Sequence, residues 1–255
     1  MKTPHKVYAN LILLRHGESS WNLENRFTGW TNVPLTENGV KEASFAAQEI
    51  HKLPFTINFI YTSYLQRAIS TAEIVSKKIN FNPQNIVYDW RINERHYGNL
   101  QGLNKSETAK KFGEDKVLIW RRSYDVPPPL MNIDNVECPH FDDKFKDIPI
   151  HQIPRGESLK DVILRLKPFW KKLSSIISDN GGNFLIVGHS NSLRAIVKVL
   201  EHISDKDIIK LNLPTGVPLH YRLNRDLSII NKNFLIDDNE LLKKQKSIEN
   251  QGKIK

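Results

Sequence analysis

The sequence predicts an α/β protein in which helices cover both faces of a parallel sheet. Three observations lead to this prediction. Short runs of branched apolar residues alternate with longer stretches of helical periodicity, the strand–helix–strand order of parallel sheets. Two of the apolar runs stop at turns that contain glycine. The length of 255 residues suits one large domain, and we expect a single domain over residues 1–255.

The first part of the chain supplies three strands and two helices. Residues 7–14 are mostly apolar and predict a buried strand. Thr36 is a suitable N-cap for the stretch after it, in which apolar residues recur on one helical face. In order, we predict strands at 7–14, 59–62 and 85–90 and helices at 36–52 and 64–79.

Residues 94–156 interrupt this alternation. Short helices are predicted at 104–112 and 114–122, and Pro127-Pro128-Pro129 then leads into a polar stretch with little periodicity. An insertion of this size in an α/β domain usually forms a cap or a surface loop. We therefore predict a cap inserted at about 94–156.

The alternation resumes after the cap. A long helix is predicted at 157–178, and Pro168 inside it is expected to kink or restart it. Gly181-Gly182 then turns the chain into a buried strand. The remaining predicted elements are a strand at 183–187, a helix at 192–201, strands at 217–223 and 227–235, and a mobile, charged helical tail at about 237–255.

Composition narrows the functional classes. Lys and Arg exceed Asp and Glu by nine, 37 against 28, which suggests an anionic partner: nucleic acid, a membrane surface or a phosphorylated metabolite. The single cysteine, Cys138, excludes an intrachain disulfide and a Cys₄ or Cys₂His₂ metal site. No apolar run reaches the ~18 residues of a membrane span, and no signal peptide is evident. We expect a cytoplasmic protein without a membrane partner.

Two histidines follow apolar strands in matching contexts. His16 stands in Arg15-His16-Gly17, and His189 stands in Gly188-His189-Ser190. Ligands of open α/β sheets bind beyond the carboxyl ends of the strands, and a helix N-terminus, such as the one after His189, favours anions. A solvated turn is the alternative for either histidine alone. The nine histidines show no HExxH or HxH spacing, so we expect no metal site.

Several arginines also follow strands or cluster. Arg67 opens the helix after the strand at 59–62, and Glu94 follows the next strand in a stretch that also holds arginines. Arg121-Arg122 is an adjacent pair beside aromatic residues, which suggests a clamp for a carboxylate or phosphate. The alternative is a set of solvated or salt-bridged surface residues, worth ~0–1 kcal/mol each.

With these residues in view, nearly the whole chain resembles the cofactor-dependent phosphoglycerate mutases of the histidine phosphatase superfamily. An Arg-His-Gly triplet alone would be weak support, but many long motifs occur here in order. They are Leu14-Arg15-His16-Gly17-Glu18-Ser19, Trp21-Asn22, Asn25-Arg26-Phe27-Thr28-Gly29-Trp30, Asn93-Glu94-Arg95-His96-Tyr97-Gly98, Gly102-Leu103-Asn104-Lys105, Trp120-Arg121-Arg122-Ser123-Tyr124-Asp125, Glu157-Ser158-Leu159-Lys160-Asp161 and Pro214-Thr215-Gly216-Val217-Pro218.

The resemblance implies a three-layer α/β/α sandwich around a mixed, mostly parallel sheet, and a homo-oligomer, dimer or tetramer. It implies that His16 is the nucleophile that carries phosphate and that Glu94 donates and accepts the proton. The phosphoryl group would be surrounded by Arg15, Arg67 and His189. The positions that it implies for substrate binding are Ser19, Asn22, Thr28, Gly29, Tyr97, Lys105, Arg121, Arg122, Ser190 and Asn191.

The implied reaction interconverts 3-phosphoglycerate and 2-phosphoglycerate, with 2,3-bisphosphoglycerate as primer and no metal. Moving a phosphate between two hydroxyls of one acid needs a carrier, and a neutral imidazole is nucleophilic near pH 7. Nearby arginines disfavour the imidazolium form and balance the charge of the transferred group. The Arg121-Arg122 pair would hold the substrate carboxylate.

The sequence departs from the family in one loop. The family commonly has Gly where this chain has Ser190, and the added side chain bears on how closely phosphate approaches. Ser19 and Gly29 match the mutases rather than the related bisphosphoglycerate synthases, which tend to replace both residues. Two stretches remote from His16, at 154–158 and 203–205, look more like the synthases.

Two other functions compete with the mutase. The nearer one is the same fold used mainly as a bisphosphoglycerate synthase or phosphatase, activities that we also expect as minor ones. The other is nucleic-acid binding, which the net charge suggests but the dispersed cations do not support, so we expect no nucleic-acid partner. We expect the tail at about 237–255 to close over the site and exclude water, which favours transfer over hydrolysis.

Overall fold

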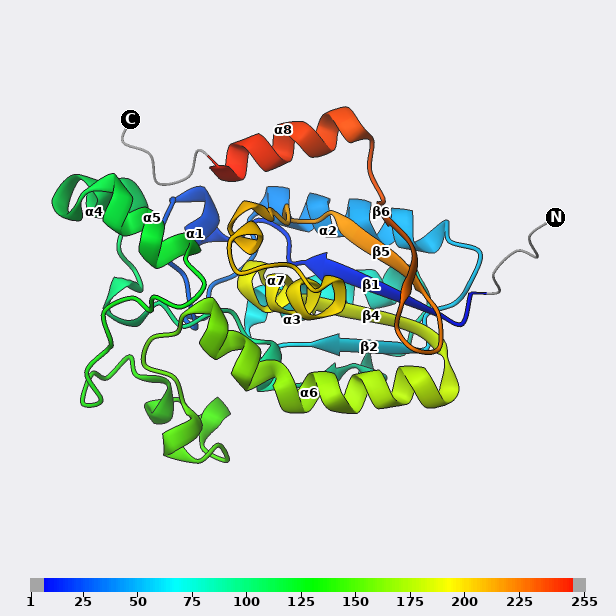
Figure 1. The fold of residues 1–255 in the computed structure, drawn as a ribbon, viewed down its shortest axis with the longest axis horizontal. Helices are drawn as coiled ribbons and strands as arrows, with labels where there is room; N and C mark the ends of the chain where they lie inside the picture. The colour runs from blue at the N-terminus through cyan, green and yellow to red at the C-terminus, as the bar shows by residue number, and fades with distance from the viewer. Residues whose placement is uncertain (1–6, 250–255) are drawn as a thin grey trace.

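The computed structural model describes residues 7–249, and its middle layer is a mixed sheet (Figure 1). Within those residues the sheet has six strands in the order β3-β2-β4-β1-β5-β6. The strands β1 to β4 run parallel to one another, and β5 is antiparallel to both β1 and β6. Their bounds are Ala9–Arg15 (β1), Phe59–Thr62 (β2), Val87–Tyr88 (β3), Gly182–Gly188 (β4), Pro218–Leu223 (β5) and Ile229–Phe234 (β6).

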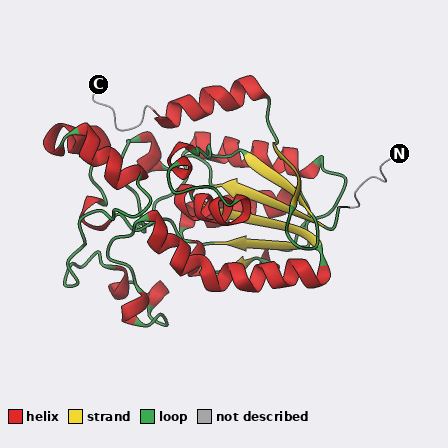
Figure 2. Ribbon diagram, in the orientation of Figure 1, coloured by secondary structure: helices red, strands yellow, loops and turns green. Residues whose placement is uncertain are grey.

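Helices form the outer layers, as the secondary-structure colouring shows (Figure 2). Two of them, α2 and α3, pack on one face of the sheet, and α6 and α7 pack on the other. The described helices are Ser20–Leu23 (α1), Glu37–His51 (α2), Gln66–Lys78 (α3), Lys105–Phe112 (α4), Glu114–Arg122 (α5), Leu159–Asn180 (α6), Ser190–Glu201 (α7) and Asp238–Glu249 (α8). The predicted α/β sandwich is confirmed.

The alternation of side chains along each central strand builds two cores. In β1, Leu11 and Leu13 point toward α6 and α7, whereas Ile12 and Leu14 point toward α2 and α3. All four side chains are buried, because a parallel strand that helices cover on both faces has no solvent-exposed face. This explains why residues 7–14 are apolar without a polar–apolar alternation.

Most predicted elements lie where the sequence placed them, and Thr36 caps α2 through the Gly39 N–H as expected. The strand predicted at 85–90 is limited to two residues, because Asp89 caps a 3₁₀ turn at Trp90–Ile92. Pro168 neither ends nor restarts α6, which continues as one helix to Asn180. Pro168 is exposed, so water can bond the carbonyl that its missing N–H leaves free.

The segment 94–156 lies beyond the carboxyl ends of the parallel strands, on the side of α4 and α5 in Figure 1. It holds those two helices and several short 3₁₀ turns joined by irregular chain. Phe145 of this segment packs with Trp30 and Trp90 in a separate apolar cluster, which joins the segment to the rest of the domain. The cap at about 94–156 stays a prediction about function.

Two glycines bring the loop after β1 against the start of α2. A Cβ on Gly39 would lie 2.0 Å from the carbonyl oxygen of Glu18, and one on Gly17 would lie 2.1 Å from the carbonyl oxygen of Gly39. Both distances are far below van der Waals contact, so the two backbones touch only because neither residue has a side chain.

We expect Gly39→Ala to lower the free energy of unfolding by about 2 kcal/mol or more, because backbone atoms would have to separate. Alanine elsewhere in a helix is favourable, so propensity predicts the opposite sign. Urea unfolding measures the difference. Gln48→Ala, at an exposed position of the same helix, is the control and should change stability by less than ~0.5 kcal/mol. Equal stability of the two variants would contradict the close approach.

Candidate active site

The two histidines meet because β1 and β4 are adjacent and parallel. Arg15 pairs in register with Gly188, and the backbone N–H of His16 donates to the carbonyl of Gly188 at 3.0 Å. The loops that follow the two strands therefore start at the same level of the sheet. The rings of His16 and His189 lie with centroids 5.0 Å apart at 59°.

Hydrogen bonds define which nitrogen of His16 is nucleophilic. Its Nδ1 lies 2.7 Å from the carbonyl oxygen of Gly17, which can only accept, so Nδ1 carries the proton. The lone pair of Nε2 then accepts from Nε of Arg67 at 3.3 Å. Burial lowers the pKa of His16 well below its ordinary value, and the charges of Arg67 and Arg15 lower it further. The ring is therefore neutral with Nε2 directed toward the cations.

His189 is buried beside it as the N-cap residue of α7. Its Nε2 lies 2.8 Å from Oγ of Ser63, and its Nδ1 is buried without a hydrogen-bond partner. Burial lowers the pKa of His189 well below the ordinary value, with Arg67 as the next cause. When Ser63 donates to Nε2, the proton of the neutral ring lies on Nδ1 as a donor for an anion.

Arg67 and Arg15 are buried, and Glu94 is the nearby negative charge that acts on both. Arg67 is 1% exposed and donates to the carbonyls of Gly29 and Thr31, while Nη1 of Arg15 donates to the carbonyl of Leu213. Burial lowers the pKa of Arg67 to about 10 and also lowers that of Arg15. Such groups are costly unless an opposite charge joins them, so the arrangement favours an anion.

Glu94 supplies negative charge to this site. Its Oε1 accepts from the backbone N–H of Arg95 at 2.7 Å and from that of Asn191 at 3.1 Å. Asn191 lies in the first turn of α7, so the carboxylate is held at a positive helix end. Glu94, at the start of the segment 94–156, is thus held against the loop that follows β4.

Side chains from the cap and from α7 form the opposite wall. The hydroxyl of Tyr97 accepts from Nη2 of Arg95 at 3.3 Å and from Nδ2 of Asn191 at 3.2 Å. Oδ1 of Asn191 accepts in turn from Arg194 at 2.9 Å. The amide orientation of Asn191 is therefore determined by Arg194, and the proton of the phenol is left to donate into the cavity.

The cations of this wall are also buried. Burial lowers the pKa of Arg121 to about 10 and that of Arg194 to about 9. Burial and the neighbouring charge of Arg121 lower the pKa of Lys105 well below its ordinary value. An anion that enters the cavity favours the charged forms of all three groups, because opposite charge offsets their desolvation.

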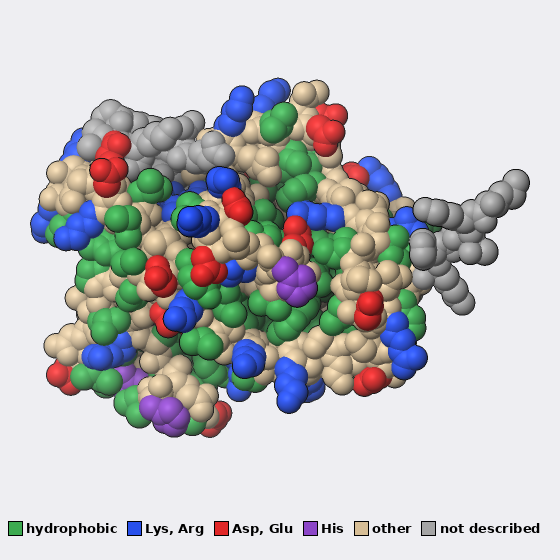
Figure 3. Space-filling view, in the orientation of Figure 1, with side chains coloured by type: hydrophobic (Ala, Val, Ile, Leu, Met, Phe, Trp, Pro, Cys, Tyr) green, Lys and Arg blue, Asp and Glu red, His purple; other side chains and the backbone are tan. Residues whose placement is uncertain are grey.

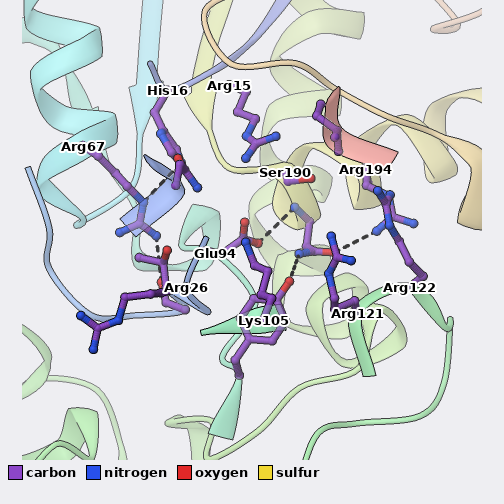
Figure 4. Close-up of a pocket in the computed structure, with 16 residues that line it drawn as sticks. Arg15, His16, Arg26, Arg67, Glu94, Lys105, Arg121, Arg122, Ser190 and Arg194 are labelled. Carbon is purple, nitrogen blue, oxygen red and sulfur yellow. Dashed lines mark hydrogen bonds between the residues drawn. The ribbon is translucent and has the colours of Figure 1, made fainter. Parts of the chain in front are cut away.

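Figure 4 shows these side chains converging on one cavity. Among the described residues, seven cations and a single carboxylate line it. The lining residues are Arg15, His16, Asn22, Arg26, Thr28, Gly29, Arg67, Glu94, Tyr97, Lys105, Arg121, Arg122, Ser190, Asn191, Arg194 and Ile248.

Two predicted site residues do not line the cavity. Ser19 is buried and caps α1, where its N–H and hydroxyl both donate to Oδ1 of Asn22. It acts on the cavity through Asn22. His189 is absent from the lining, but its ring lies against that of His16, which lines the cavity.

Three lining residues were missed by sequence reasoning. Arg194 had a usable signal, since it follows Ser190 and Asn191 by about one helical turn and so shares their face. Arg26 belongs to a motif that the sequence analysis singled out. Nothing in the sequence marked Ile248 itself, although it lies in α8, within the tail that was expected to close over the site.

The tail helix α8 packs beside α2 (Figure 1). Nζ of Lys244 lies 2.7 Å from Oε1 of Glu42, and Oε2 of Glu42 accepts from the backbone N–H of Glu18 at 2.8 Å. Glu42 therefore links the tail to the loop that follows His16, and Ile248 contributes to the cavity wall. The mobility of the tail stays a prediction, and residues 250–255 lie outside the described part of the chain.

Neither a metal-binding cluster nor a membrane-spanning helix is found in the described part of the chain. Over residues 7–249, no group of three or more His, Cys, Asp or Glu side chains is arranged to hold a metal ion. No helix in that range has the length and apolar character needed to span a membrane. On the face seen in Figure 3, basic and acidic side chains are interspersed.

Comparison with known proteins places the chain in a family. The model of the histidine phosphatase superfamily (branch 1) matches residues 11–137 and 130–224. The chain belongs to the histidine phosphatase superfamily. Within it, the chain is 47% identical over 246 residues to the 2,3-bisphosphoglycerate-dependent phosphoglycerate mutase of Parabacteroides distasonis, covering 96% of this chain and 99% of that protein. It is 48% identical to phosphoglycerate mutase 2 of Bacteroides thetaiotaomicron, with the same coverage.

Solved structures share the histidine phosphatase fold. Mycobacterial hydrolase 1 matches with a TM-score of 0.68 at 22% identity, covering 89% of this chain and 96% of that one. A mycobacterial glucosyl-3-phosphoglycerate phosphatase matches with a TM-score of 0.67 at 21% identity, covering 90% and 98%. At these identities the likeness concerns the fold.

The buried histidines of this histidine phosphatase predict a loss of stability in mild acid. The pKa of His96 is lowered to about 3 by burial and then by Arg165, and those of His16 and His189 are lowered as well. Between the unfolded pKa near 6.5 and the lower native values, the unfolded chain binds more protons than the native one. The free energy of unfolding should therefore fall as the pH drops below ~6.5, by up to ~1.4 kcal/mol per pH unit and histidine.

Urea unfolding between pH 7.5 and 5.5 measures this slope. His96→Asn should reduce the slope by about one proton, and His151→Asn, at an exposed position, should leave it unchanged. Stability that stays constant or rises as the pH falls from 6.5 to 5.5 would contradict the prediction.

Proposed function

We propose that this protein is an isomerase that interconverts 3-phosphoglycerate and 2-phosphoglycerate through a phosphohistidine at His16, primed by 2,3-bisphosphoglycerate. The observation that carries the proposal is the neutral His16 ring, whose unprotonated Nε2 faces Arg67 inside a cavity that is lined, among the described residues, by seven cations and one carboxylate. A nucleophile and an anion site are thereby combined. The names of the relatives at 47–48% identity support the same activity.

In the first step, Nε2 of His16 attacks the phosphorus of the donor, so that a P–N bond forms while a P–O bond breaks. Arg15, Arg67 and Nδ1–H of His189 balance the charge on the phosphoryl oxygens. Glu94, in its protonated form, gives its proton to the departing oxygen and becomes a carboxylate. In the second step the hydroxyl of the acceptor returns that proton to Glu94 as its oxygen takes the phosphoryl group from His16.

The carboxylate of the substrate is assigned to the opposite wall. Arg121 and Arg122 come from the last turn of α5, and Lys105 and Tyr97 lie nearby in the cavity lining. A guanidinium can bind a carboxylate through two parallel hydrogen bonds. Recognition of the carboxylate gives a mutase a preference for phosphoglycerates over simple phosphate esters.

Buried polar atoms without hydrogen-bond partners fit the primer, which carries two phosphates and a carboxylate. An unsatisfied buried donor is costly, and an anionic oxygen satisfies it. Such atoms in or beside the cavity are Nε of Arg15, Oγ1 of Thr28, Nδ1 of His189 and Nε of Arg194. We propose a transfer without a metal cofactor, since Arg15 and Arg67 supply the positive charge. We also propose a cytoplasmic homo-oligomer, dimer or tetramer.

Gly29 supports the mutase over the synthase. It has a positive φ of 54°, and a Cβ there would lie 1.9 Å from Oε1 of Gln101. Ser190, where the family commonly has Gly, is the first residue of α7 and lines the cavity. Its hydroxyl is assigned as an additional donor to the substrate.

The purified protein incubated with 2,3-bisphosphoglycerate should form an acid-labile, base-stable phosphoenzyme, because a phosphoramidate has that stability. Turnover of 3-phosphoglycerate, coupled to enolase, should depend on the primer. We expect His16→Asn to abolish both, a loss of about 10⁴-fold or more, since the nucleophile is removed. A variant that still turns over with the primer would refute the mechanism.

The contact between α8 and α2 predicts a second effect. Deletion of residues 240–255 should raise hydrolysis relative to mutase activity, because water then reaches the phosphohistidine. Lys244→Ala should raise the same ratio by up to about fivefold, since a partly exposed ion pair contributes at most ~1 kcal/mol. Lys243→Ala, an exposed neighbour in α8, is the control. A ratio unchanged by the deletion would exclude a closing role for the tail.

A further inference from the structure

A buried ion pair lies outside the cavity, behind the segment that carries Glu94. Nε of Arg165 lies 2.6 Å from Oε1 of Glu157, and Nη2 of Arg165 lies 3.0 Å from Oε2. The two side chains are 5% and 4% exposed. Neither lines the cavity, and the proposed mechanism uses neither. A doubly hydrogen-bonded pair at this depth needs a reason, because burying two charges often contributes nothing net to stability.

The remaining donors of Arg165 all bond to the backbone that leads to Glu94. Nη1 donates to the carbonyl of Arg91 at 2.7 Å and more weakly to that of Asn93 at 3.3 Å. Nη2 donates to the carbonyls of Asn93 at 3.3 Å and Glu94 at 3.2 Å. One guanidinium from α6 thus donates hydrogen bonds to several backbone carbonyls of a segment that is distant in the sequence.

Glu157 holds the other side of the same segment. Its Oε2 accepts from the backbone N–H of His96 at 2.8 Å, and its own N–H donates to the carbonyl of His96 at 2.8 Å. The ion pair therefore forms hydrogen bonds with the backbone on both sides of Glu94. These hydrogen bonds are needed to fix the segment, because residues 93–97 belong to no strand or helix whose regular backbone hydrogen bonds would hold them.

Hydrogen bonds also fix the carbonyl and the carboxyl group of Glu94 itself. The carbonyl of Glu94 accepts from Nε1 of Trp30 at 2.6 Å as well as from Arg165, and its Oε1 accepts from Arg95 and Asn191. The guanidinium of Arg165 also lies 5.4 Å from the Trp30 ring centroid. Both the main chain and the side chain of Glu94 are therefore fixed before any substrate binds, as proton transfer in a confined site requires.

We propose that the Arg165–Glu157 pair is a positioning device for the carboxyl group of Glu94, acting on proton transfer and not on substrate binding. The proposal rests on the proposed function, in which Glu94 exchanges the proton. Arginine is required rather than lysine, because only a planar guanidinium can bond two carboxylate oxygens and several carbonyls at once. A displacement of Glu94 by about 1 Å costs up to ~100-fold in rate.

The test measures single-turnover phosphorylation of His16 by 2,3-bisphosphoglycerate. Arg165→Lys keeps the charge and loses most of the carbonyl contacts, so we expect a 10- to 100-fold slower transfer with the dissociation constant of the primer changed less than threefold. The decisive comparison is with Glu94→Gln. The double variant should be no slower than Glu94→Gln alone, because a residue that acts through Glu94 has no effect once that carboxyl is gone.

A second readout uses p-nitrophenyl phosphate, whose leaving group departs as a stable anion and needs no proton from Glu94. Arg165→Lys should release p-nitrophenolate at a rate within threefold of the unmodified protein. Glu157→Gln, which retains the shape of the side chain, should show the same pattern and serves if Arg165→Lys does not fold. Arg222→Lys is the matched control, because it is exposed and pairs in register with Asn10, at the far end of β1 from His16.

The outcomes separate this inference from the function that it rests on. Slowing by Arg165→Lys that multiplies with the slowing by Glu94→Gln would overturn the positioning role, as would equal losses with both phosphate donors. A rate for Arg165→Lys within twofold of the unmodified protein would also overturn it. Unchanged transfer in Glu94→Gln would instead count against the proposed role of Glu94.

Discussion

The parallel pairing of β1 with β4 is the interaction on which the site depends. Because Arg15 lies in register with Gly188, β1 and β4 end at the same level of the sheet. The two loops that follow them, separated by more than 170 residues in the sequence, therefore bring their histidines together. A shift of one residue would turn Leu11 and Leu13 toward the wrong core and move His16 away from His189. The two apolar cores therefore fix the register, and the register builds the site.

The cavity concentrates buried positive charge that the protein alone does not neutralise. Arg15 and Arg67 donate mainly to backbone carbonyls, and burial lowers the pKa of each. Burying these charges lowers the stability of the folded chain, and an anion that enters the cavity offsets that loss. The affinity for phosphate and the lower stability of the empty site therefore have the same origin. The same charges keep His16 neutral, which makes it a nucleophile.

Positioning comes from a network deeper than the cavity. Glu94 lies in irregular chain, and its place is determined by donors from α6, from α7 and from Trp30. The tail adds a contact from the opposite side, since Glu42 joins α8 to the loop after His16. Rigid helices thus hold groups that the local backbone would leave free.

The sequence by itself determined the layers and the strand ends. Apolar runs, helix caps and glycine turns are local features, and they located β1, β2, α2 and the helices of the cap within a few residues. They also placed His16 and His189 at matching strand ends, because the residues next to a strand determine where it ends. The motifs quoted from the sequence supplied Glu94 and the Arg121-Arg122 pair.

Only the tertiary structure decided which distant side chains complete the site. Arg194 and Ile248 joined the cavity, Ser19 was placed behind Asn22, and Arg165 was brought against Glu94 from 71 residues further along the chain. The spacing of Arg194 from Ser190 and Asn191 indicates a shared helix face, but no spacing in the sequence encodes the contacts of Ile248 and Arg165. They depend on how α6, α7 and α8 pack against the sheet, and packing is set by the sum of many weak interactions rather than by any one residue.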